Sequence, residues 1–102
     1  MDSILRRFKD KTTSEGHALF VSEKSGVMSI GFKRSGEYED DHDPFINVAW
    51  IERTGAGFSV GWFYDDGEEP ADSSEFSREE DVVDAVNKAI EERSKEVGPS
   101  RT

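Results

Sequence analysis

Carboxylates are the side chains of this sequence whose number and spacing most suggest a chemistry. Two acidic runs stand out. Residues 37–43 hold five carboxylates and no lysine or arginine, and residues 65–81 hold nine carboxylates and one arginine. Such oxygen ligands can hold a hard cation, and a pair of them can exchange protons in a cleft. A preformed array of carboxylates can also pair with arginine and lysine side chains of another protein.

The spacing of these residues argues against a metal site. An EF-hand calcium loop has the pattern D-x-[DN]-x-[DN]-G, with a glutamate at position twelve. Asp43 is followed by proline, and the sequence D-D-G at residues 65–67 lacks that spacing. A transition metal would depend on His42 among adjacent acids, and adjacent residues give a poor ligand geometry. The sequence therefore predicts no metal ligands.

Catalytic chemistry also lacks its usual residues. The chain has no cysteine, and no serine stands in a G-x-S-x-G nucleophile elbow. An acid–base pair of carboxylates needs a cleft in which burial separates their pKa values, whereas these carboxylates fall in expected loops. Gly55 and Gly57 form no phosphate-binding motif. The sequence therefore predicts a protein that is not an enzyme, with no catalytic residues and no cofactor.

The overall charge favours a protein partner of opposite sign. The 102 residues include 13 Lys+Arg and 23 Asp+Glu, which gives a formal net charge of −10. Binding to nucleic acid needs a basic surface that displaces counterions, so we expect no direct contact with nucleic acid. A basic protein suits this charge, because opposite potentials speed and orient encounter. Solubility alone is the other explanation of the acidity.

The cysteine content and the hydropathy indicate the compartment. A chain without cysteine forms no disulfide and fits a reducing cytoplasm. No apolar run approaches the roughly 20 residues of a membrane span. The basic residues near the N-terminus are not followed by the apolar core of a signal peptide. We therefore expect a cytoplasmic protein without membrane contact.

The elements that must position the acidic runs form a simple series. Runs rich in aromatic and β-branched residues predict four strands, at residues 18–23, 27–33, 45–53 and 58–64. The expected segments are an N-terminal helix and linker at 1–16 (helix at 3–11), a β-meander at 17–64, an acidic loop at 65–77, a helix at 78–97 and a flexible tail at 98–102. This order predicts one small α+β domain, an antiparallel four-stranded meander covered by one C-terminal helix.

The C-terminal helix has the clearest local signals. The sequence S-R-E-E at residues 77–80 is a capping box with Ser77 as the N-cap. Apolar residues follow at helical spacing from Val82 to Val97, and Gly98 and Pro99 are typical of a helix end. The single apolar stripe predicts that the helix packs on the sheet by one side.

The second hairpin decides which side chains share a face of the sheet. A three-residue loop at 55–57 pairs Thr54 with Phe58 and sets Trp50 opposite Trp62, whereas a shift of one residue would separate the two tryptophans. We expect the first register because it collects one apolar face, namely Ile46, Val48, Trp50, Phe58, Val60 and Trp62. The other face would carry Ser29, Gly31, Phe45, Ala49, Ile51, Ser59, Gly61 and Phe63. Either the N-terminal helix covers that face, as we expect, or a partner does.

The meander predicts that the two acidic runs meet. Alternate connections of an up-down sheet share one end, which would then carry a net charge of −13, with −5 from residues 37–43 and −8 from residues 65–81. Solvation of two long loops would explain this charge without a partner. The functional explanation is a surface for a cationic partner, and its expected residues are Glu37, Glu39, Asp40, Asp41, Asp43, Asp65, Asp66, Glu68, Glu69 and Asp72.

Size, acidity and the lack of catalytic groups together suggest a function. Our hypothesis is a non-enzymatic acidic inhibitor, such as an immunity protein or a phage-type antagonist. It would mask the basic surface of a nuclease toxin or of a nucleic-acid-binding complex, with carboxylates in place of phosphates. The alternative is a generic interaction adaptor or a secretion chaperone that works through the apolar sheet face.

Overall fold

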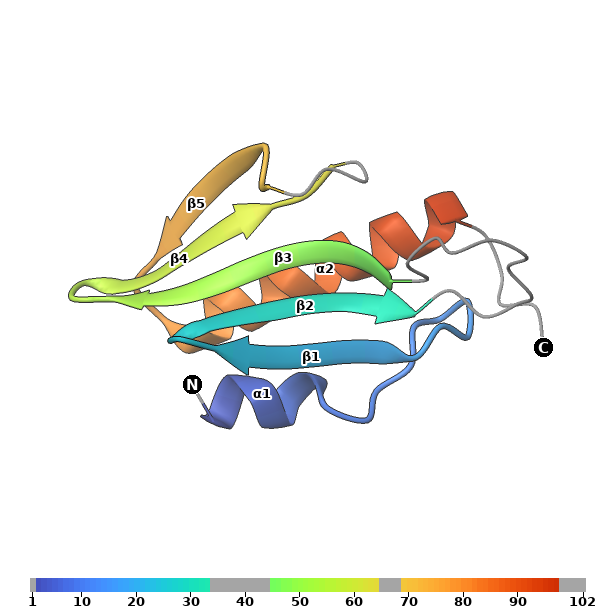
Figure 1. Cartoon of the computed structure of the whole chain (residues 1–102), viewed down its shortest axis with the longest axis horizontal. Coiled ribbons are helices and arrows are strands. Elements are labelled where there is room, and N and C mark those ends of the chain that lie inside the picture. Colours follow the sequence, from blue (N-terminus) through green and yellow to red (C-terminus); the bar gives the residue numbers. More distant parts are fainter. Residues whose placement is uncertain (1, 34–44, 65–68, 98–102) are drawn as a thin grey trace.

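A computed structural model of the chain describes residues 2–33, 45–64 and 69–97. The elements in this part of the chain are α1 (Asp2–Phe8), β1 (Leu19–Lys24), β2 (Val27–Lys33), β3 (Phe45–Thr54), β4 (Gly57–Trp62), β5 (Asp72–Phe76) and α2 (Glu79–Val97). The strands form one antiparallel sheet in the order β1-β2-β3-β4-β5, and α2 crosses one of its faces (Figure 1). The α+β class and the antiparallel meander are confirmed.

β5 corrects the prediction of four strands. The sequence D-S-S-E-F is polar and poor in strand formers, so its local pattern predicts an acidic loop. The structure pairs it with β4, with Ser74 opposite Val60 and Phe76 opposite Phe58. Trp62 Nε1 donates a hydrogen bond to Ser74 Oγ at 3.0 Å, and Phe76 packs against the core. Pairing with β4 therefore outweighs the weak local preference of these residues.

β5 also moves the start of the C-terminal helix to the opposite end of the sheet. The extra strand runs the chain back, so α2 begins at the end that holds the β1–β2 and β3–β4 turns (Figure 1). Its acidic first turn, Glu79, Glu80 and Asp81, thus lies far from the end at which β2 stops and β3 starts. The predicted net charge of −13 at one end is therefore wrong, because an odd number of strands precedes the helix.

α2 begins at Glu79, one residue later than predicted. The Arg78 carbonyl accepts a hydrogen bond from the Val82 N–H at 3.3 Å, which gives Arg78 the N-cap position instead of Ser77. The carboxylates of the first turn lie favourably at the positive end of the helix dipole. The helix buries its apolar stripe against the sheet, at Val82, Val83, Val86 and Ile90. The predicted helix stop at Gly98 and Pro99 lies outside the described residues.

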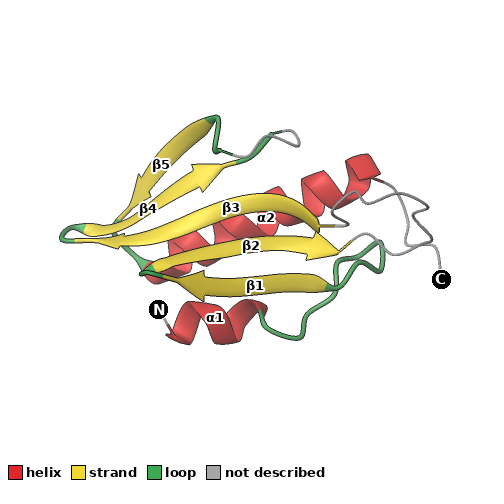
Figure 2. Cartoon of the chain, viewed as in Figure 1, coloured by secondary structure: helices red, strands yellow, loops and turns green. Residues whose placement is uncertain are grey.

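α1 shares this core, and it does not cover the second face of the sheet. Ile4 and Phe8 are fully buried in the same cluster as Val82, and the Ser3 hydroxyl donates a hydrogen bond to the Glu79 carboxylate. α1 therefore closes the core beside β1, on the side of the sheet that α2 occupies (Figure 2). The expected cover of the opposite face by the N-terminal helix is wrong, and that helix spans residues 2–8 instead of 3–11.

The register of the β3–β4 hairpin differs from the prediction by one residue. Thr54 pairs with Gly57, which makes the loop two residues long and sets Trp50 opposite Gly61 instead of opposite Trp62. Two-residue loops are the commonest connections in hairpins. The shift turns the two tryptophans to opposite faces of the sheet.

A β-bulge in β3 keeps the apolar pattern intact despite this shift. Ile30 lies opposite Ala49, whereas the next residue, Gly31, lies opposite Asn47, so Val48 is an extra residue in the ladder. A bulge lets two residues adjacent in sequence, Val48 and Ala49, both face the core. The buried positions of β3 are consequently Ile46, Val48, Ala49 and Ile51. A strand without a bulge turns every second side chain to the same face, so it would not bury these four residues together. The predicted register assumes such a regular strand.

The core lies between the sheet and the two helices. Its members on β2 and β4, Met28, Ile30, Phe32 and Val60, are fully buried. In the part of the chain that the structure describes, neither helix has the length and apolar character that a membrane crossing requires.

Candidate functional site

The sheet face turned away from the helices carries small side chains around one tryptophan. The register gives two cross-strand rows on this face. One row is Ser29, Trp50, Gly61 and Ser73, and the next is Val27, Glu52, Ser59 and Glu75. The predicted positions of Ser29, Gly31, Ser59 and Gly61 on this face are confirmed. Those of Ala49 and Ile51 are wrong, because the bulge turns both into the core, and the side chain of Phe45 lies outside the described residues.

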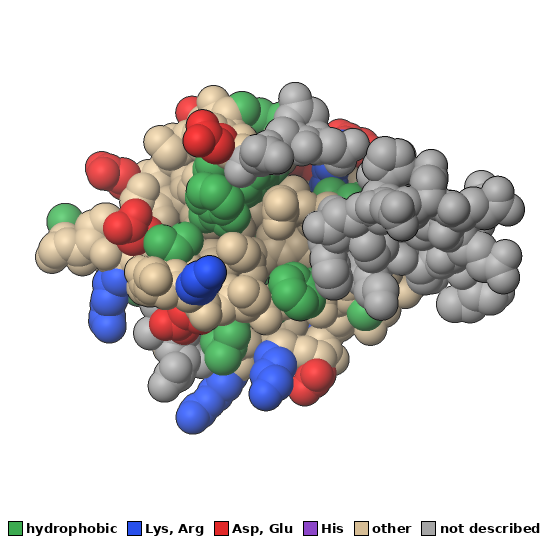
Figure 3. Space-filling view, in the orientation of Figure 1, with side chains coloured by type: hydrophobic (Ala, Val, Ile, Leu, Met, Phe, Trp, Pro, Cys, Tyr) green, Lys and Arg blue, Asp and Glu red, His purple; other side chains and the backbone are tan. Residues whose placement is uncertain are grey.

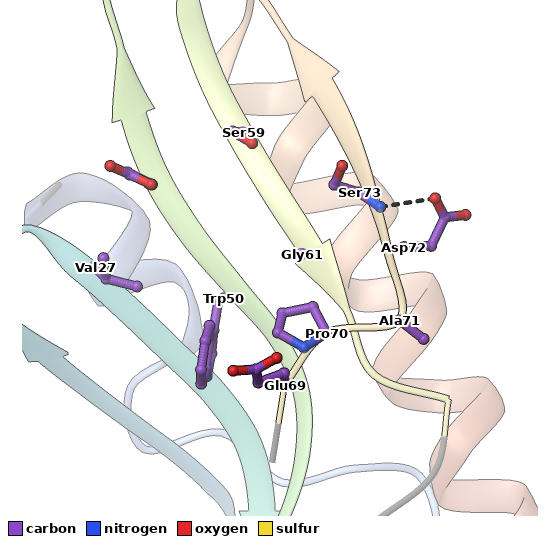
Figure 4. Close-up of a pocket in the computed structure, with 10 residues that line it drawn as sticks. Val27, Trp50, Ser59, Gly61, Glu69, Pro70, Ala71, Asp72 and Ser73 are labelled. Atoms are coloured by element: carbon purple, nitrogen blue, oxygen red, sulfur yellow. Dashed lines mark hydrogen bonds between the residues drawn. The ribbon is translucent and has the colours of Figure 1, made fainter. Parts of the chain in front are cut away.

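A groove of about 670 Å³ opens on this face. Such a volume is within the range of ligand-binding pockets in general. Strands β2, β3 and β4 supply its floor, and the segment that enters β5 supplies one wall (Figure 4). The described residues that line it are Val27, Trp50, Glu52, Ser59, Gly61, Glu69, Pro70, Ala71, Asp72 and Ser73.

Gly61 allows the wall segment to lie against the sheet. A Cβ atom at Gly61 would lie 2.7 Å from Cγ of Pro70, so the absence of a side chain makes room for the proline ring. The Ala71 N–H donates a hydrogen bond to the Trp62 carbonyl at 2.9 Å. The wall is therefore fixed to β4 by a backbone hydrogen bond and by close packing.

Asp72 has its own hydrogen bonds at the start of β5. Its Oδ1 accepts the Ser73 N–H at 2.8 Å, and the Tyr64 hydroxyl donates to its Oδ2 at 3.4 Å. A carboxylate that occupies a backbone N–H at the edge of a sheet blunts that edge against pairing with another strand. Asp72 thus fixes the end of the groove wall while its side chain remains exposed.

Trp50 is the aromatic part of the groove. It is half-buried, and its ring meets that of Phe63 edge-on, with 5.1 Å between the ring centroids and 73° between the planes. Phe63 is itself only 5% exposed, and its N–H donates a hydrogen bond to the Val48 carbonyl at 3.0 Å. Because Phe63 is held in this way, Trp50 presents its ring to the groove from a defined position.

Asp72 lines the groove by its position in the wall, but its side chain shares the face of its cross-strand partner Trp62 and points away from the groove (Figure 4). The charged side chains of the described residues that face the groove, Glu52 and Glu69, are both carboxylates. Glu75 adds a third on the same face, across the strand pair from Ser59. Lys24, opposite Val27, shares this face at its β1 edge, and further basic residues lie in and just after α1, at Arg6, Arg7, Lys9 and Lys11. Figure 3 shows most of the red side chains over the β4–β5 half of this face and most of the blue ones toward β1 and α1. Among the described residues of this face, negative charge therefore lies mainly over β4 and β5, and positive charge lies toward β1 and α1.

Two of the ten predicted partner-binding residues lie within the described residues, and both are among those that line the groove, one of them with its carboxylate turned to the other face. These are Glu69 and Asp72. The other eight, Glu37, Glu39, Asp40, Asp41, Asp43, Asp65, Asp66 and Glu68, lie outside the described residues. Sequence reasoning missed Trp50 and Glu52. A two-residue loop in the second hairpin would have placed both on the open face, because residues 50 and 52 of a strand share a face.

A second group of polar residues has a structural role. The Ser94 hydroxyl donates to Thr13 Oγ1 at 2.8 Å, and the same oxygen accepts the His17 N–H at 3.0 Å. All three residues are buried, and the His17 ring packs on Phe32 with 5.1 Å between centroids. This group ties the segment between α1 and β1 to α2. Within the described ranges, no cluster of three or more His, Asp or Glu side chains is arranged to hold a metal ion.

Comparison with known proteins adds no family to this description. Protein-family models, curated proteins and solved structures were each compared with the chain, and none of them matches it. The function is therefore inferred from the geometry and the charge of the groove.

Proposed function

We propose that the protein is a non-enzymatic inhibitor that binds a basic surface of a target protein through the open face of its sheet. The groove is the observation that carries this proposal. It combines a fixed tryptophan with the carboxylates of Glu52 and Glu69, Glu75 lies on the same face, and no lysine or arginine stands among the described residues that line it. Cations are attracted both to the face of an indole ring and to carboxylates. The lining therefore suits cationic side chains of a partner.

The placement of the groove on strands supports a binding role. Side chains on a paired sheet are held more rigidly than side chains on loops, so less conformational entropy is lost when a partner binds. Glu52 lies in the interior of β3, and the wall at Pro70 is packed against Gly61. The net charge of −10 adds a long-range attraction for a cationic partner.

A nuclease or a nucleic-acid-binding complex is the class of target that we propose. Its working surface must be basic in order to bind phosphates, so an anionic protein can occupy that surface and block it. The protein would work in this manner as an immunity protein against a nuclease toxin or as a phage-type antagonist. The proposal requires no catalytic group in the inhibitor.

Affinity capture with matched variants tests this function. The bait is the full chain, and the groove variant combines Glu52→Gln, Glu69→Gln and Glu75→Gln, all exposed positions on the groove face. The control variant combines Asp81→Asn, Asp84→Asn and Glu92→Gln, which removes the same charge from exposed positions of α2 on the other side of the sheet. Captured proteins are identified by mass spectrometry from extracts of the native host, and the activity of the captured target is then assayed.

The expected result is a basic, nucleic-acid-binding target that wild type and control variant capture and inhibit and that the groove variant does not. Association should slow at higher salt, since screening shortens the range of the attraction to about 8 Å at physiological ionic strength. Equal capture by groove and control variants would refute the proposed use of the groove. A target that is captured but remains fully active would refute inhibition.

One observation favours the adaptor or secretion chaperone as a second candidate. Phe20 on β1 is 42% exposed and lies opposite Gly31, on the same open face as Trp50. A partner that covers both aromatic side chains would bind through apolar contacts, and its affinity would vary little with salt. Loss of capture with Phe20→Ser, but not with the groove variant, would support this candidate instead.

A further inference from the structure

The surroundings of Trp50 indicate which cation the groove would hold. Figure 4 shows the indole ring upright in the groove, with Glu69 and Pro70 on one side of it and Val27 on the other. Glu52 follows two residues later on β3 and faces the same way, about 7 Å along the strand. The indole ring of Trp50 therefore has Glu69 beside it and Glu52 further along β3.

Arginine matches this arrangement better than lysine does. Its guanidinium is planar, stacks on aromatic faces and presents a fixed fork of N–H donors to a carboxylate. An ammonium group is compact and strongly hydrated, and it gains less from a flat ring in an open groove. Because Glu52 and Glu69 are exposed, they offer hydrogen bonds without the cost of burying unpaired charges.

The rest of the groove accommodates the backbone around such a side chain. The floor beside Trp50 consists of Ser59, Gly61 and Ser73, whose side chains are small or absent. A volume of about 670 Å³ exceeds that of one guanidinium group, so neighbouring residues of the target also fit. Arginine is also among the residues that most often dominate the energy of protein interfaces.

We infer that the groove binds an arginine side chain of the target, with its guanidinium stacked on Trp50 and hydrogen-bonded to Glu69 or Glu52. This inference rests on the proposed function, because it names the target residue that the groove recognises. Arginine is therefore the anchor of the complex, and lysine at the same position is a weaker substitute.

Titration of the full chain with short peptides tests this assignment. The peptides consist of glycine and serine around one central residue, which is arginine, lysine or citrulline, the uncharged isostere of arginine. The chain has two tryptophans, so the NMR signals of the Trp50 and Trp62 indole N–H groups report on both faces at once. Trp62 lies on the helix side and serves as the internal control, and a Trp62→Phe variant assigns the two signals.

The arginine peptide should shift the Trp50 signal and leave the Trp62 signal in place. We expect it to bind roughly two- to fivefold more tightly than the lysine peptide, which corresponds to the energy of a cation–π contact at an exposed site. The citrulline peptide should bind more weakly than either. Trp50→Leu should remove the difference between arginine and lysine, and Glu69→Gln, at an exposed position, should weaken binding of both cationic peptides.

The outcomes separate this inference from the proposed function. Equal affinities of the arginine and lysine peptides, or a shift of the Trp62 signal alone, would overturn the arginine assignment. So would the absence of any shift with the arginine peptide. In each of these cases the capture experiment still decides whether the groove carboxylates bind a basic target.

Discussion

A single methyl group at Gly31 tests the bulge on which the position of Trp50 depends. A Cβ atom built there would lie 2.0 Å from the carbonyl oxygen of Ile46 and 2.9 Å from its carbonyl carbon. Both atoms belong to the backbone of β3, so no side chain can rotate away to make room. Gly31→Ala must therefore separate β2 from β3 or remove the bulge.

The expected cost follows from opposing contributions. Overpacking costs about 1–3 kcal/mol, and each ladder hydrogen bond that is lost costs about 1 kcal/mol more. The unfolded chain of the alanine variant has less conformational freedom, which stabilises the folded state by about 0.4–1 kcal/mol. We expect Gly31→Ala to lower the free energy of unfolding by about 2–4 kcal/mol, out of the 5–15 kcal/mol usual for a domain. This corresponds to a fall in Tm of about 10–25 °C.

Two other glycines provide matched controls for this measurement. A Cβ atom at Gly55, in the β3–β4 turn, meets nothing within 4 Å, so Gly55→Ala should change stability by no more than about 0.5 kcal/mol. At Gly61 the obstacle is the Pro70 ring at 2.7 Å, which can shift with its segment. Gly61→Ala should therefore cost less than Gly31→Ala, but it should displace the groove wall and weaken peptide binding.

Urea denaturation of the three variants, followed by circular dichroism, gives the comparison directly. The midpoints should fall in the order Gly55→Ala, Gly61→Ala and Gly31→Ala, with similar m-values. If Gly31→Ala were as stable as Gly55→Ala, the backbone of β3 would not approach Gly31, and the bulge would be absent. Trp50 would then have no reason to lie on the open face.

Two further variants test the core side of the sheet and the pH dependence of stability. Trp62→Ala should lower the free energy of unfolding by about 2–4 kcal/mol, since a large aromatic contact and the hydrogen bond to Ser74 are both lost; an unchanged urea midpoint would place Trp62 outside the core. The neighbouring hydroxyl of Ser94, opposed by partial burial and assisted by that of Ser14, lowers the pKa of Glu15 below its ordinary value of 4.5. A lowered pKa in the folded state means that the ionised carboxyl stabilises the fold above pH 4.5 and that this stabilisation is lost as the pH falls through the folded-state pKa. The difference in unfolding free energy between wild type and Glu15→Gln should therefore shrink from about pH 6 to about pH 3, and a difference that stays constant would contradict the lowered pKa.

The elements that the sequence predicts correctly are those with strong local signals. The strand formers of β1 to β4 and the helical spacing of α2 place these elements to within a few residues. β5 has no such signal, because Asp72, Ser73, Ser74 and Glu75 prefer loops and only the partner strand makes them a strand. A prediction without β5 runs the chain in the wrong direction before α2 and therefore places the start of α2 at the wrong end of the sheet.

The candidate site was predictable only from its charge. Glu69 and Asp72 belong to an acidic run that can be read from the sequence, whereas Glu52 stands alone in a strand. The predicted three-residue hairpin loop places Trp50 in the core. The observed loop is shorter by one residue, and a shift of one residue exchanges the faces of a whole strand. The bulge in β3 keeps the apolar residues buried despite this exchange of faces, and it depends on pairing with another strand. The sequence indicates it only through a glycine, Gly31, within an apolar strand.

The outward position of Trp50 is itself an argument that this face has a role. Burial of a large side chain contributes about 1.5–3 kcal/mol, so a strand selected for stability alone would turn its tryptophan inward. Here the bulge allows Val48 and Ala49 to take consecutive places in the core, and Trp50 is turned out beside Phe63. Proteins give up stability in this manner mainly where a function requires it. The same irregularity therefore completes the core on one face and supplies the aromatic side chain of the groove on the other.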